Sequence, residues 1–269
     1  MLENHGQISV TAGVMVESYD HGHVHNAGLI SGQTSHGIYV ILGSLDVEIR
    51  NSGTVSGANG ITVSVSTVER LVNTGEILGG DADGRGVDLG AASSGAVIVN
   101  RGLIAGELRS IAGSSHDDTI RNAGLLEGDV ELSGGHDVYR GKRGGWVDGE
   151  VRGGVGNDLL VGSSADDVLS GDNGHDVLRG RGGDDVLIGG NGRDVFDIQL
   201  GNGNDVIMDF ASNDLVDLSD FGLGWKRIKN SLAHDGYEGL MIDLSEHGGG
   251  SILFAELTLD GFSRSDFIL

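Results

Sequence analysis

Six aspartates in the second half of the chain stand at a fixed place in a nine-residue pattern. From Gly153 the sequence reads GGVGNDLLV, GSSADDVLS, GDNGHDVLR, GRGGDDVLI and GGNGRDVFD without a gap, and a sixth copy, LGNGNDVIM, follows two inserted residues. The sixth position is always aspartate: Asp158, Asp167, Asp176, Asp185, Asp194 and Asp205. The eighth is always apolar: Leu160, Leu169, Leu178, Leu187, Phe196 and Ile207. Carboxylates at regular spacing among glycines are suited to holding a series of hard cations.

Calcium is the cation that this composition favours. It takes about six to eight oxygen ligands, and glycines let the backbone bend so that several carbonyl oxygens converge on one point. Residues 153–220 contain 14 aspartates and no glutamate, against three arginines. A surface that serves only solubility mixes both acids with lysine. The exclusive use of the shorter acid therefore indicates a fixed geometry, as ion coordination requires.

The nine-residue pattern also predicts the fold that positions these aspartates. A glycine-rich loop followed by a three-residue strand is not stable alone, but stacked copies bury the apolar eighth side chain and form a parallel β-roll. Two copies complete one turn, so every second loop lies on the same edge. Asp158, Asp176 and Asp194 are expected on one edge, and Asp167, Asp185 and Asp205 on the other. Degenerate copies precede the array, GSSHDDTIR from Gly113 and LSGGHDVYR from Leu132.

The first 131 residues repeat a different pattern, Asn-x-Gly-x-Ile-x-Gly. It begins at Asn4, Asn26, Asn51, Asn73, Asn100 and Asn122, in steps of 22, 25, 22, 27 and 22 residues. This period, with short alternating stretches such as ITVSVS and AVIVN, predicts a parallel β-helix of three-sided rungs. Asparagine and glycine tolerate the left-handed backbone that corners use, and stacked asparagines can hydrogen-bond as a ladder.

The sequence thus predicts an all-β chain in three parts: a parallel β-helix at 1–131, a β-roll at 132–210 and a β-rich C-terminal cap at 211–269. The last part has no repeat, but contains short alternating segments such as GLMIDL and SILFAEL. A stack of parallel strands needs such a cap, because its last turn otherwise exposes an unpaired edge.

Charge and composition exclude several classes of function. The chain of 269 residues has 40 acidic and 17 basic residues, for a net charge of −23, which disfavours nucleic acid as a partner. It has no cysteine, no apolar run long enough to span a membrane, and no cleavable signal sequence at its N-terminus. If the protein is exported, another part of the chain must direct the export.

From Gly113 to the end, and most specifically over 153–210, the chain resembles the RTX (repeats-in-toxin) haemolysin-type calcium-binding proteins. In that family, each ion takes carbonyls from positions one and three of one loop, carbonyls from positions two and four of the loop one turn on, and both aspartates. The resemblance implies about three to five calcium ions. It implies these ligand sets: Gly153, Val155, Asp158, Asp172, Gly174 and Asp176; Gly162, Ser164, Asp167, Arg181, Gly183 and Asp185; Gly171, Asn173, Asp176, Gly190, Gly192 and Asp194; Gly180, Gly182, Asp185, Gly201, Gly203 and Asp205.

Two of these sets depart from the family pattern. GSSADD differs at positions two and four, so we expect the second site to be weaker, and the two inserted residues change the spacing of the fourth. The segment DVIMDFASNDLVDLSDF resembles the end of an RTX array, and the final SRSDFIL resembles a signal for type I secretion. The resemblance therefore implies a secreted protein that uses type I secretion machinery and folds when it meets extracellular calcium.

The role of the β-helix stays open between two classes. A structural, adhesion or matrix module that binds extracellular glycans is favoured over an enzyme. The alternative is a polysaccharide lyase or uronan epimerase, with Tyr19, Asp20 and His21 in its site, although the Asp-Pro-His-Glu motif of the epimerases cannot occur in a chain without proline. The absence of HExxH argues against the peptidase of some RTX proteins, and no GxSxG motif occurs either. His21, His23 and His25 stand at alternate positions, so a strand would place them on one face, where they could bind zinc or copper.

Overall fold

The computed structural model divides the chain into two compact units, Met1–Arg152 and Gly153–Leu269. Strands account for 54% of the chain and helices for 7%, which confirms the all-β prediction. The structure describes every residue except 11–13, 17–20, 34, 42–44, 65–66, 81, 83, 235–238, 256 and 258–261, and describes only the backbone of 10, 21, 45–46 and 232–234. None of the described helices has the length and apolar composition that crossing a bilayer requires.

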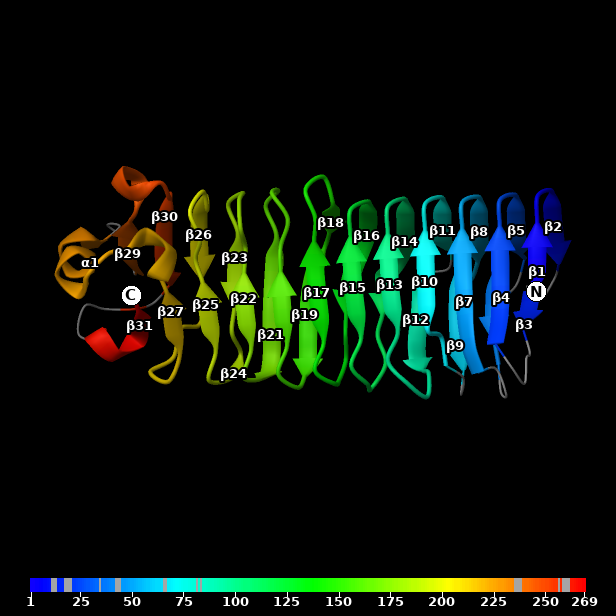
Figure 1. Ribbon diagram of the computed structural model, residues 1–269, viewed down its shortest axis with the longest axis horizontal. Coiled ribbons are helices and arrows are strands. Elements are labelled where there is room, and N and C mark those ends of the chain that lie inside the picture. Colours follow the sequence, from blue (N-terminus) through cyan, green and yellow to red (C-terminus); the bar gives the residue numbers. More distant parts are fainter. Residues whose placement is uncertain are drawn as a thin grey trace. The chain divides into compact units, whose positions relative to one another are not determined.

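The first unit is a parallel solenoid whose rungs have three sides (Figure 1). The first side contains β1 (Leu2–Asn4), β4 (His21–Asn26), β7 (Leu45–Asn51), β10 (Arg70–Asn73), β13 (Val97–Asn100), β15 (Thr119–Asn122) and β17 (Val138–Gly141). The second contains β2 (Gln7–Val10), β5 (Leu29–Gly32), β8 (Thr54–Gly57), β11 (Glu76–Gly79) and β18 (Trp146–Asp148); the third contains β3 (Val14–Val16), β6 (Ile38–Val40), β9 (Ile61–Ser64), β12 (Arg85–Ala91) and β19 (Glu150–Val155). The longer strands β14 (Leu103–Ala112) and β16 (Leu125–Glu131) each run along the second and third sides.

Each side contributes one column of apolar side chains to the core. Alternate residues of a strand point to opposite faces, so in-register stacking places equivalent residues on top of one another. On the first side the buried column consists of Val24, Ile49, Leu71, Ile98, Ile120 and Tyr139, all at most 2% exposed. The core is therefore built from the β-branched stretches that predicted the solenoid.

The asparagine ladder predicted from the sequence is present. The side-chain amide of each asparagine donates to the side-chain oxygen of the next, over 2.8–2.9 Å, along Asn4, Asn26, Asn51, Asn73, Asn100 and Asn122. Each of the last four is at most 2% exposed. The same amides also donate to backbone carbonyls at the corner, so the ladder fixes both the turn and the stacking of rungs.

The corner glycines are needed for a reason other than the one predicted. The left-handed conformation expected at these corners is not found there: neither the ladder asparagines nor Gly28, Gly53, Gly75, Gly102 and Gly124 have a positive φ. Instead, a methyl group on Gly75 would overlap the carbonyl oxygen of Gly53 in the previous rung, and the other four repeat this close approach. Glycine is required because adjacent rungs touch at the corner, and the ladder sets that distance.

The second unit begins as a flattened roll with two strands per turn. One edge contains β20 (Leu159–Val161), β22 (Val177–Arg179), β25 (Val195–Asp197) and β27 (Leu215–Asp217); the other contains β21 (Val168–Gly174), β23 (Val186–Ile188), β24 (Asn191–Gly192) and β26 (Asn204–Ile207). Val168 pairs with Val186 and Val177 with Val195, so two nonapeptides make one turn. All six apolar eighth-position side chains are 0% exposed.

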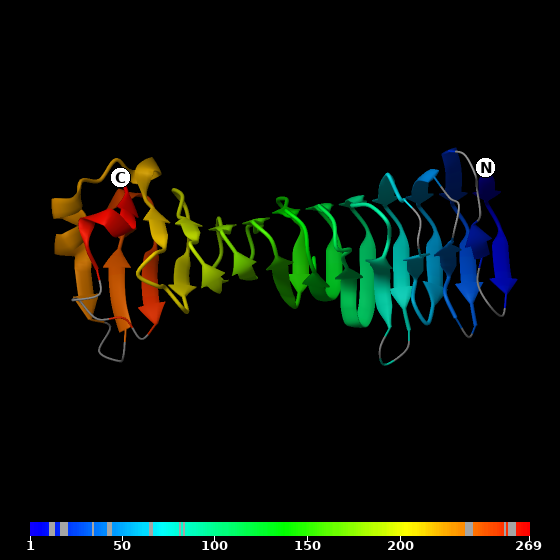
Figure 2. The same cartoon turned by 90° about the horizontal axis from the view of Figure 1, so that it is seen from below.

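The C-terminal segment continues both edges and closes the core. Strand β30 (Ser251–Ala255) pairs with β26, and β31 (Phe267–Ile268) with β27, while β28 (Leu232–His234) and β29 (Gly239–Asp243) add antiparallel strands. Helix α1 (Trp225–Ser231) and three 3₁₀ turns, η1 (Ser219–Phe221), η2 (Ser245–His247) and η4 (Arg264–Asp266), complete it (Figure 2). Its aromatic side chains pack in a chain of contacts that involves Phe196, Phe210, Phe254, Phe262, Phe267 and Trp225. The β-rich cap was predicted, but the helix was not.

Replacing one asparagine of the ladder tests how much it stabilises the solenoid. Asn73→Ala removes one of the acceptors of the Asn51 amide, the side-chain donor to the Asn100 amide oxygen, and a hydrogen bond to the Leu103 carbonyl oxygen. Because Asn51 and Asn100 are buried, we expect the free energy of unfolding to fall by about 1–3 kcal/mol. Thr74→Ala, at the exposed neighbouring position, removes only a 3.3 Å hydrogen bond from the hydroxyl to the Asn51 carbonyl oxygen and should lower it by less, at most about 1 kcal/mol. Equal effects in urea denaturation would show that the ladder does not stabilise the fold.

Candidate calcium sites

The sixth-position aspartates form a hydrogen-bonded ladder along each edge of the roll. The backbone N–H of each aspartate donates to Oδ1 of the aspartate one turn later. The distance is 2.7 Å from Asp158 to Asp176 and 2.9 Å from Asp176 to Asp194 on one edge. On the other it is 2.8 Å from Asp167 to Asp185 and 3.2 Å from Asp185 to Asp205. This arrangement brings together the aspartate pairs that the sequence predicted.

The second oxygen of these carboxylates is buried without a hydrogen-bond donor. This holds for Oδ2 of Asp176, Asp185 and Asp194 and for Oδ1 of Asp167, whose residues are 0–4% exposed. A buried carboxylate oxygen without a partner is costly, so such oxygens indicate a missing cation.

The first-position glycine of each loop lies against this carboxylate. A methyl group on Gly162 would lie 2.7 Å from Asp167 Oδ2 and 2.5 Å from the carbonyl oxygen of Gly180, one turn on. A methyl group on Gly171 would overlap the Asp176 carboxylate and lie 2.7 Å from the carbonyl oxygen of Gly189. At each of these two glycines, a carboxylate and a carbonyl oxygen lie so close to Cα that no side chain fits. Oxygens that converge in this way suit a cation with oxygen ligands, such as calcium.

The second position of most loops has a left-handed backbone. Its φ is 101° at Gly154, 68° at Asp172, 82° at Arg181, 90° at Gly190 and 79° at Gly201. A residue in this conformation reverses the chain and turns successive carbonyls toward one side. The conformation is unfavourable for Asp172 and Arg181, because these residues carry a Cβ. Across the described residues, no group of three or more His, Cys, Asp or Glu side chains surrounds one point. Sites on this scaffold would therefore take most of their oxygens from the backbone.

Burial and mutual repulsion make these carboxylates weak acids in the metal-free fold. Burial raises the pKa of Asp176 and of Asp185 to about 7 and that of Asp194 to about 6, and neighbouring aspartates of the ladder add to each rise. Burial also raises the pKa of Asp167, Asp205 and Asp214. A column of such groups favours either protons or a divalent cation at neutral pH.

In the first and third predicted ligand sets, the paired loops lie directly over one another. Gly174 approaches the carbonyl of Gly156 so closely that a methyl group would overlap it, and Gly192 approaches Gly174 in the same way. Asn173 of the third set pairs with Asn191. Val155 of the first set is 62% exposed at its side chain, so only its backbone is available to an ion.

The second set differs from the others in two contacts. Ser163 donates its backbone N–H to Asp167 Oδ2 over 2.6 Å, so one carboxylate oxygen is occupied by the chain itself. Arg181 Nη1 donates to the carbonyl oxygen of Gly162 over 3.2 Å, which places a guanidinium at a predicted ligand. Both contacts compete with an ion for its ligands. The first lies within GSSADD, whose departures the sequence showed, and the second comes from the second position of GRGGDDVLI.

The fourth set keeps its alignment despite the two inserted residues. Val186 pairs with Val206 and Leu187 with Ile207, and Asp185 still donates to Asp205. A methyl group on Gly182 would lie 3.2 Å from the carbonyl oxygen of Gly201. The Asn202 side-chain amide donates to Asp205 Oδ2 over 3.0 Å and occupies that oxygen.

A seventh loop, at residues 209–217, was not recognised from the sequence. Asp214 Oδ1 accepts from the N–H of Asp194 over 2.9 Å, and Val216 is buried like the other eighth-position residues. Asp209, in place of the first glycine, accepts the N–H groups of Gly189 and Gly190 over 2.8 Å each. The missed signal was the reading DFASNDLVD, which keeps aspartate sixth and an apolar residue eighth but lacks the glycines.

The degenerate copies of the first unit hold aspartates in the same way. Asp118 donates its N–H to Asp137 Oδ1 over 2.6 Å, and Asp118 Oδ1 accepts from Ala96 over 2.7 Å. In the loop GSSHDD, Ser114 donates its N–H and its hydroxyl to Asp118 Oδ2, over 2.8 and 3.1 Å. The serine satisfies the oxygen that an ion would bind, as Ser163 does in the other GSS loop.

A second ladder, at the fifth position, was also missed. The side-chain oxygen at this position accepts the backbone N–H of the fifth residue one turn on. The His175 N–H donates to Asn157 Oδ1 and the Asp184 N–H donates to Asp166 Oδ1, each over 2.8 Å. These residues are exposed, so this ladder fixes the loops from outside while the aspartate ladder lies inside. The signal available was that position five is polar in every copy.

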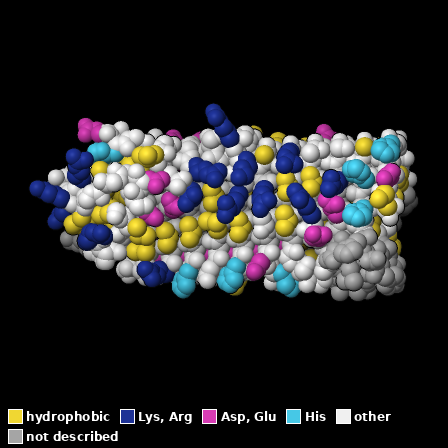
Figure 3. Space-filling model, viewed as in Figure 1, with side chains coloured by type: hydrophobic (Ala, Val, Ile, Leu, Met, Phe, Trp, Pro, Cys, Tyr) yellow, Lys and Arg dark blue, Asp and Glu magenta, His cyan; other side chains and the backbone are white. Residues whose placement is uncertain are grey.

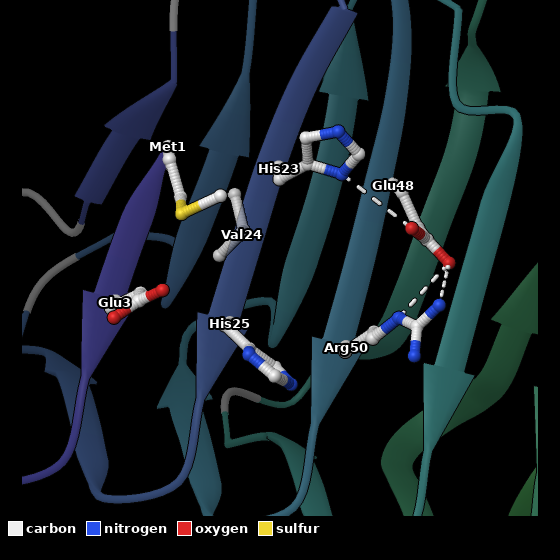
Figure 4. A pocket seen from close by; sticks show the side chains of 7 residues that line it. All are labelled: Met1, Glu3, His23, Val24, His25, Glu48 and Arg50. Carbon is white, nitrogen blue, oxygen red and sulfur yellow. Dashed lines mark hydrogen bonds and ion pairs between the residues drawn. The ribbon is translucent and has the colours of Figure 1, made fainter.

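Around His23 and His25, the described residues include no group of three or more His, Cys, Asp or Glu side chains that could hold one metal ion. His23, His25, Glu3, Glu48 and Arg50 line a shallow hollow of about 230 Å³ (Figure 4). His23 Nδ1 lies 3.5 Å from Glu48, which also pairs with Arg50 over 2.8 Å. The His21 side chain and all of Tyr19 and Asp20 lie outside the described residues, so the zinc and catalytic hypotheses stay predictions.

Comparison with known proteins agrees with this geometry. Residues 143–178, 152–187 and 161–196 each match the family model of the RTX calcium-binding nonapeptide repeat. No curated protein matches the chain. Among solved structures, the chain is similar to the solution structure of the AlgE6R3 subunit of a mannuronan C5-epimerase from Azotobacter vinelandii, with 23% identity over 60% of this chain and 83% of that chain and a TM-score of 0.31. Because that score is low, the fold rests on the strand pairing described above. Residues 143–196 therefore carry RTX-type calcium-binding nonapeptide repeats.

Proposed function

We propose that calcium binding folds the second unit, and that this protein is an extracellular module that becomes rigid only where calcium is abundant. The observation that carries the proposal is a set of buried aspartates, Asp176, Asp185 and Asp194, whose Oδ2 atoms have no hydrogen-bond donor. Without a cation these charges repel one another inside the roll. With calcium between the turns, the same charges become ligands, and binding free energy becomes folding free energy.

The ions would be held by the four ligand sets that the RTX resemblance implies. The first and third sets are the strongest candidates, since no side chain or serine N–H occupies the carboxylate oxygens of Asp176 and Asp194 that face them. The second would be weakened by Ser163 and Arg181, and the fourth by Asn202. Asp194 and Asp214 extend the same pairing to the seventh loop. The chemistry that calcium supplies here is charge neutralisation and cross-linking of successive turns.

Secretion in an unfolded state gives this dependence on calcium a use. Extracellular calcium modules bind at about 10⁻⁴–10⁻³ M, far above the free calcium of a cytosol. The second unit would then remain unfolded before export through type I machinery and fold outside. The final SRSDFIL, which resembles an export signal, supplies β31 to one edge of the roll, and the preceding β30 pairs along the other. In the folded protein that segment would close the array.

A calcium titration of the metal-free protein tests the proposal. We expect far-UV circular dichroism to gain β-signal cooperatively at about 10⁻⁴–10⁻³ M calcium, with about three or more ions bound by calorimetry. Magnesium at the same concentration should not substitute, since it needs a smaller octahedral site. A spectrum that is fully folded in chelator and unchanged by calcium would contradict the proposal.

Asp176→Asn separates coordination from fold stability. The asparagine keeps the acceptor for the Asp158 N–H but removes a charge from two ligand sets. We expect calcium affinity to fall by about tenfold or more, since a charged contact contributes about 1.5–3 kcal/mol, while the metal-free protein becomes more stable. The matched control is Asp184→Asn on the exposed fifth position, whose amide oxygen can still accept from Asn204. Loss of affinity in the control alone would refute the assignment.

Protons should partly replace calcium. The pKa values of Asp176 and Asp185 are raised to about 7, above the ordinary aspartate value of 3.8, so protonation favours the folded state. This stabilisation is complete below about pH 4 and is lost as the pH rises through about 6 to 7. Calcium-free protein should therefore show more β-structure at about pH 5 than at about pH 8 by circular dichroism, and the double variant Asp176→Asn/Asp185→Asn should lose most of the difference. More structure at the higher pH would contradict this sign.

A further inference from the structure

One face of the first unit carries a dense group of positive charges, on a chain whose net charge is −23. The face is the outer surface of the sheet formed by β7, β10, β13, β15 and β17, which lies toward the viewer in Figure 1. Figure 3 shows Lys and Arg side chains gathered over these strands. We call it the basic face and define it by its exposed cationic residues: Arg50, Arg70, Arg101, Arg121, Arg140, Lys142 and Arg143.

Most charges of the basic face have no acidic partner. Arg50 pairs with Glu48, and Arg70 lies beside the same glutamate on the neighbouring strand, but the other five residues make no ion pair with any described residue. The outward positions of the strands from β10 to β17 are arginine, valine or threonine, with no acid among them. Since the chain has only 17 basic residues, five cations without an acidic partner on one side of the solenoid form a local reversal of the overall charge.

The stacking of rungs arranges these cations in rows along the solenoid. Register places Arg50, Val72, Val99, Arg121 and Arg140 in one row across the five strands. A second row, at the turn after each ladder asparagine, includes Arg101 and Lys142. At about 4.8 Å per strand the rows extend for about 19 Å. Val72 and Val97 are partly exposed among the arginines, whereas Val99 is buried.

We propose that the basic face binds a linear anionic polysaccharide that lies along the solenoid axis. Its carboxylates or sulfates would pair with the arginines, whose planar guanidinium groups bind such anions in two-point contacts. The C–H faces of the sugar rings would cover the partly exposed side chains of Val72 and Val97. This goes beyond the calcium-dependent folding proposed above, because the basic face lies in the first unit and includes none of the calcium ligand sets.

Other polyanions fit the basic face less well. Single-stranded nucleic acid is held largely by bases stacked on aromatic side chains, and none of the described outward residues from β10 to β17 is aromatic. Duplex DNA is wide and densely charged, so it would also meet the acidic remainder of the chain. A lipid surface would need large apolar side chains to insert, and this face offers only valines among arginines.

The experiment measures binding of the calcium-loaded protein to chondroitin sulfate, which carries both carboxylate and sulfate groups. We expect saturable binding that weakens with salt and no binding to neutral dextran. The triple variant Arg101→Gln/Arg121→Gln/Arg140→Gln should bind about tenfold or more weakly, because three ion pairs are lost together. The matched control Lys226→Gln/Arg227→Gln/Lys229→Gln removes the same charge from exposed positions of α1 and should bind like the parent. Circular dichroism of each variant in calcium verifies folding independently of binding.

Three results would overturn the proposal. One is no binding to chondroitin sulfate by the folded protein. A second is an equal loss of binding in the two triple variants, which would indicate net charge alone. The third is tighter binding to duplex DNA or to phosphatidylglycerol vesicles than to chondroitin sulfate, with the same dependence on Arg101, Arg121 and Arg140, which would assign the basic face to another polyanion.

Discussion

The second unit depends on stacking carboxylates at the spacing of β-strands. Each sixth-position aspartate must sit inside the loop to accept the N–H of the previous turn, as Asp176 does for Asp158. That position buries a charge directly beside the next one, which raises the pKa of Asp176 and Asp185 to about 7. The hydrogen bonds that set the register of the roll therefore also create the repulsion that opposes it. A divalent cation between the turns removes the repulsion without disturbing the hydrogen bonds.

The first unit solves the same stacking problem with a neutral group. Asparagine presents both a donor and an acceptor, so each side chain can donate to the next and leave no buried charge, as Asn51 does to Asn73. An ionised carboxylate has no hydrogen to donate. It must accept hydrogen bonds from the backbone, or a cation must neutralise its charge. Ser114, which donates to Asp118 with both its N–H and its hydroxyl, shows an intermediate solution. The chain thus uses a neutral ladder of asparagines in one unit and a charged ladder of aspartates in the other.

Periodicity made most of the fold predictable. The nine-residue pattern placed Asp158, Asp176 and Asp194 on one edge, and the asparagine spacing predicted the ladder, because both signals are periodic and local. Close approaches between rungs leave no such signal: Gly75 is glycine because of Gly53 in the previous rung, not because of its own backbone angle. Asp214 was missed because its loop lacks the glycines, and α1 because seven residues are too few for a helical period to stand out.

The central claim is that the aspartate ladder forms only when calcium is bound. Hydrogen–deuterium exchange of the backbone amides of Asp158, Asp167, Asp176 and Asp185 tests it most directly, since each donates to a carboxylate of the next turn. The account predicts slow exchange in calcium and exchange at nearly the unfolded rate in chelator at about pH 8, while amides of the asparagine rungs stay protected in both. Equal protection of the four aspartate amides with and without calcium would contradict it.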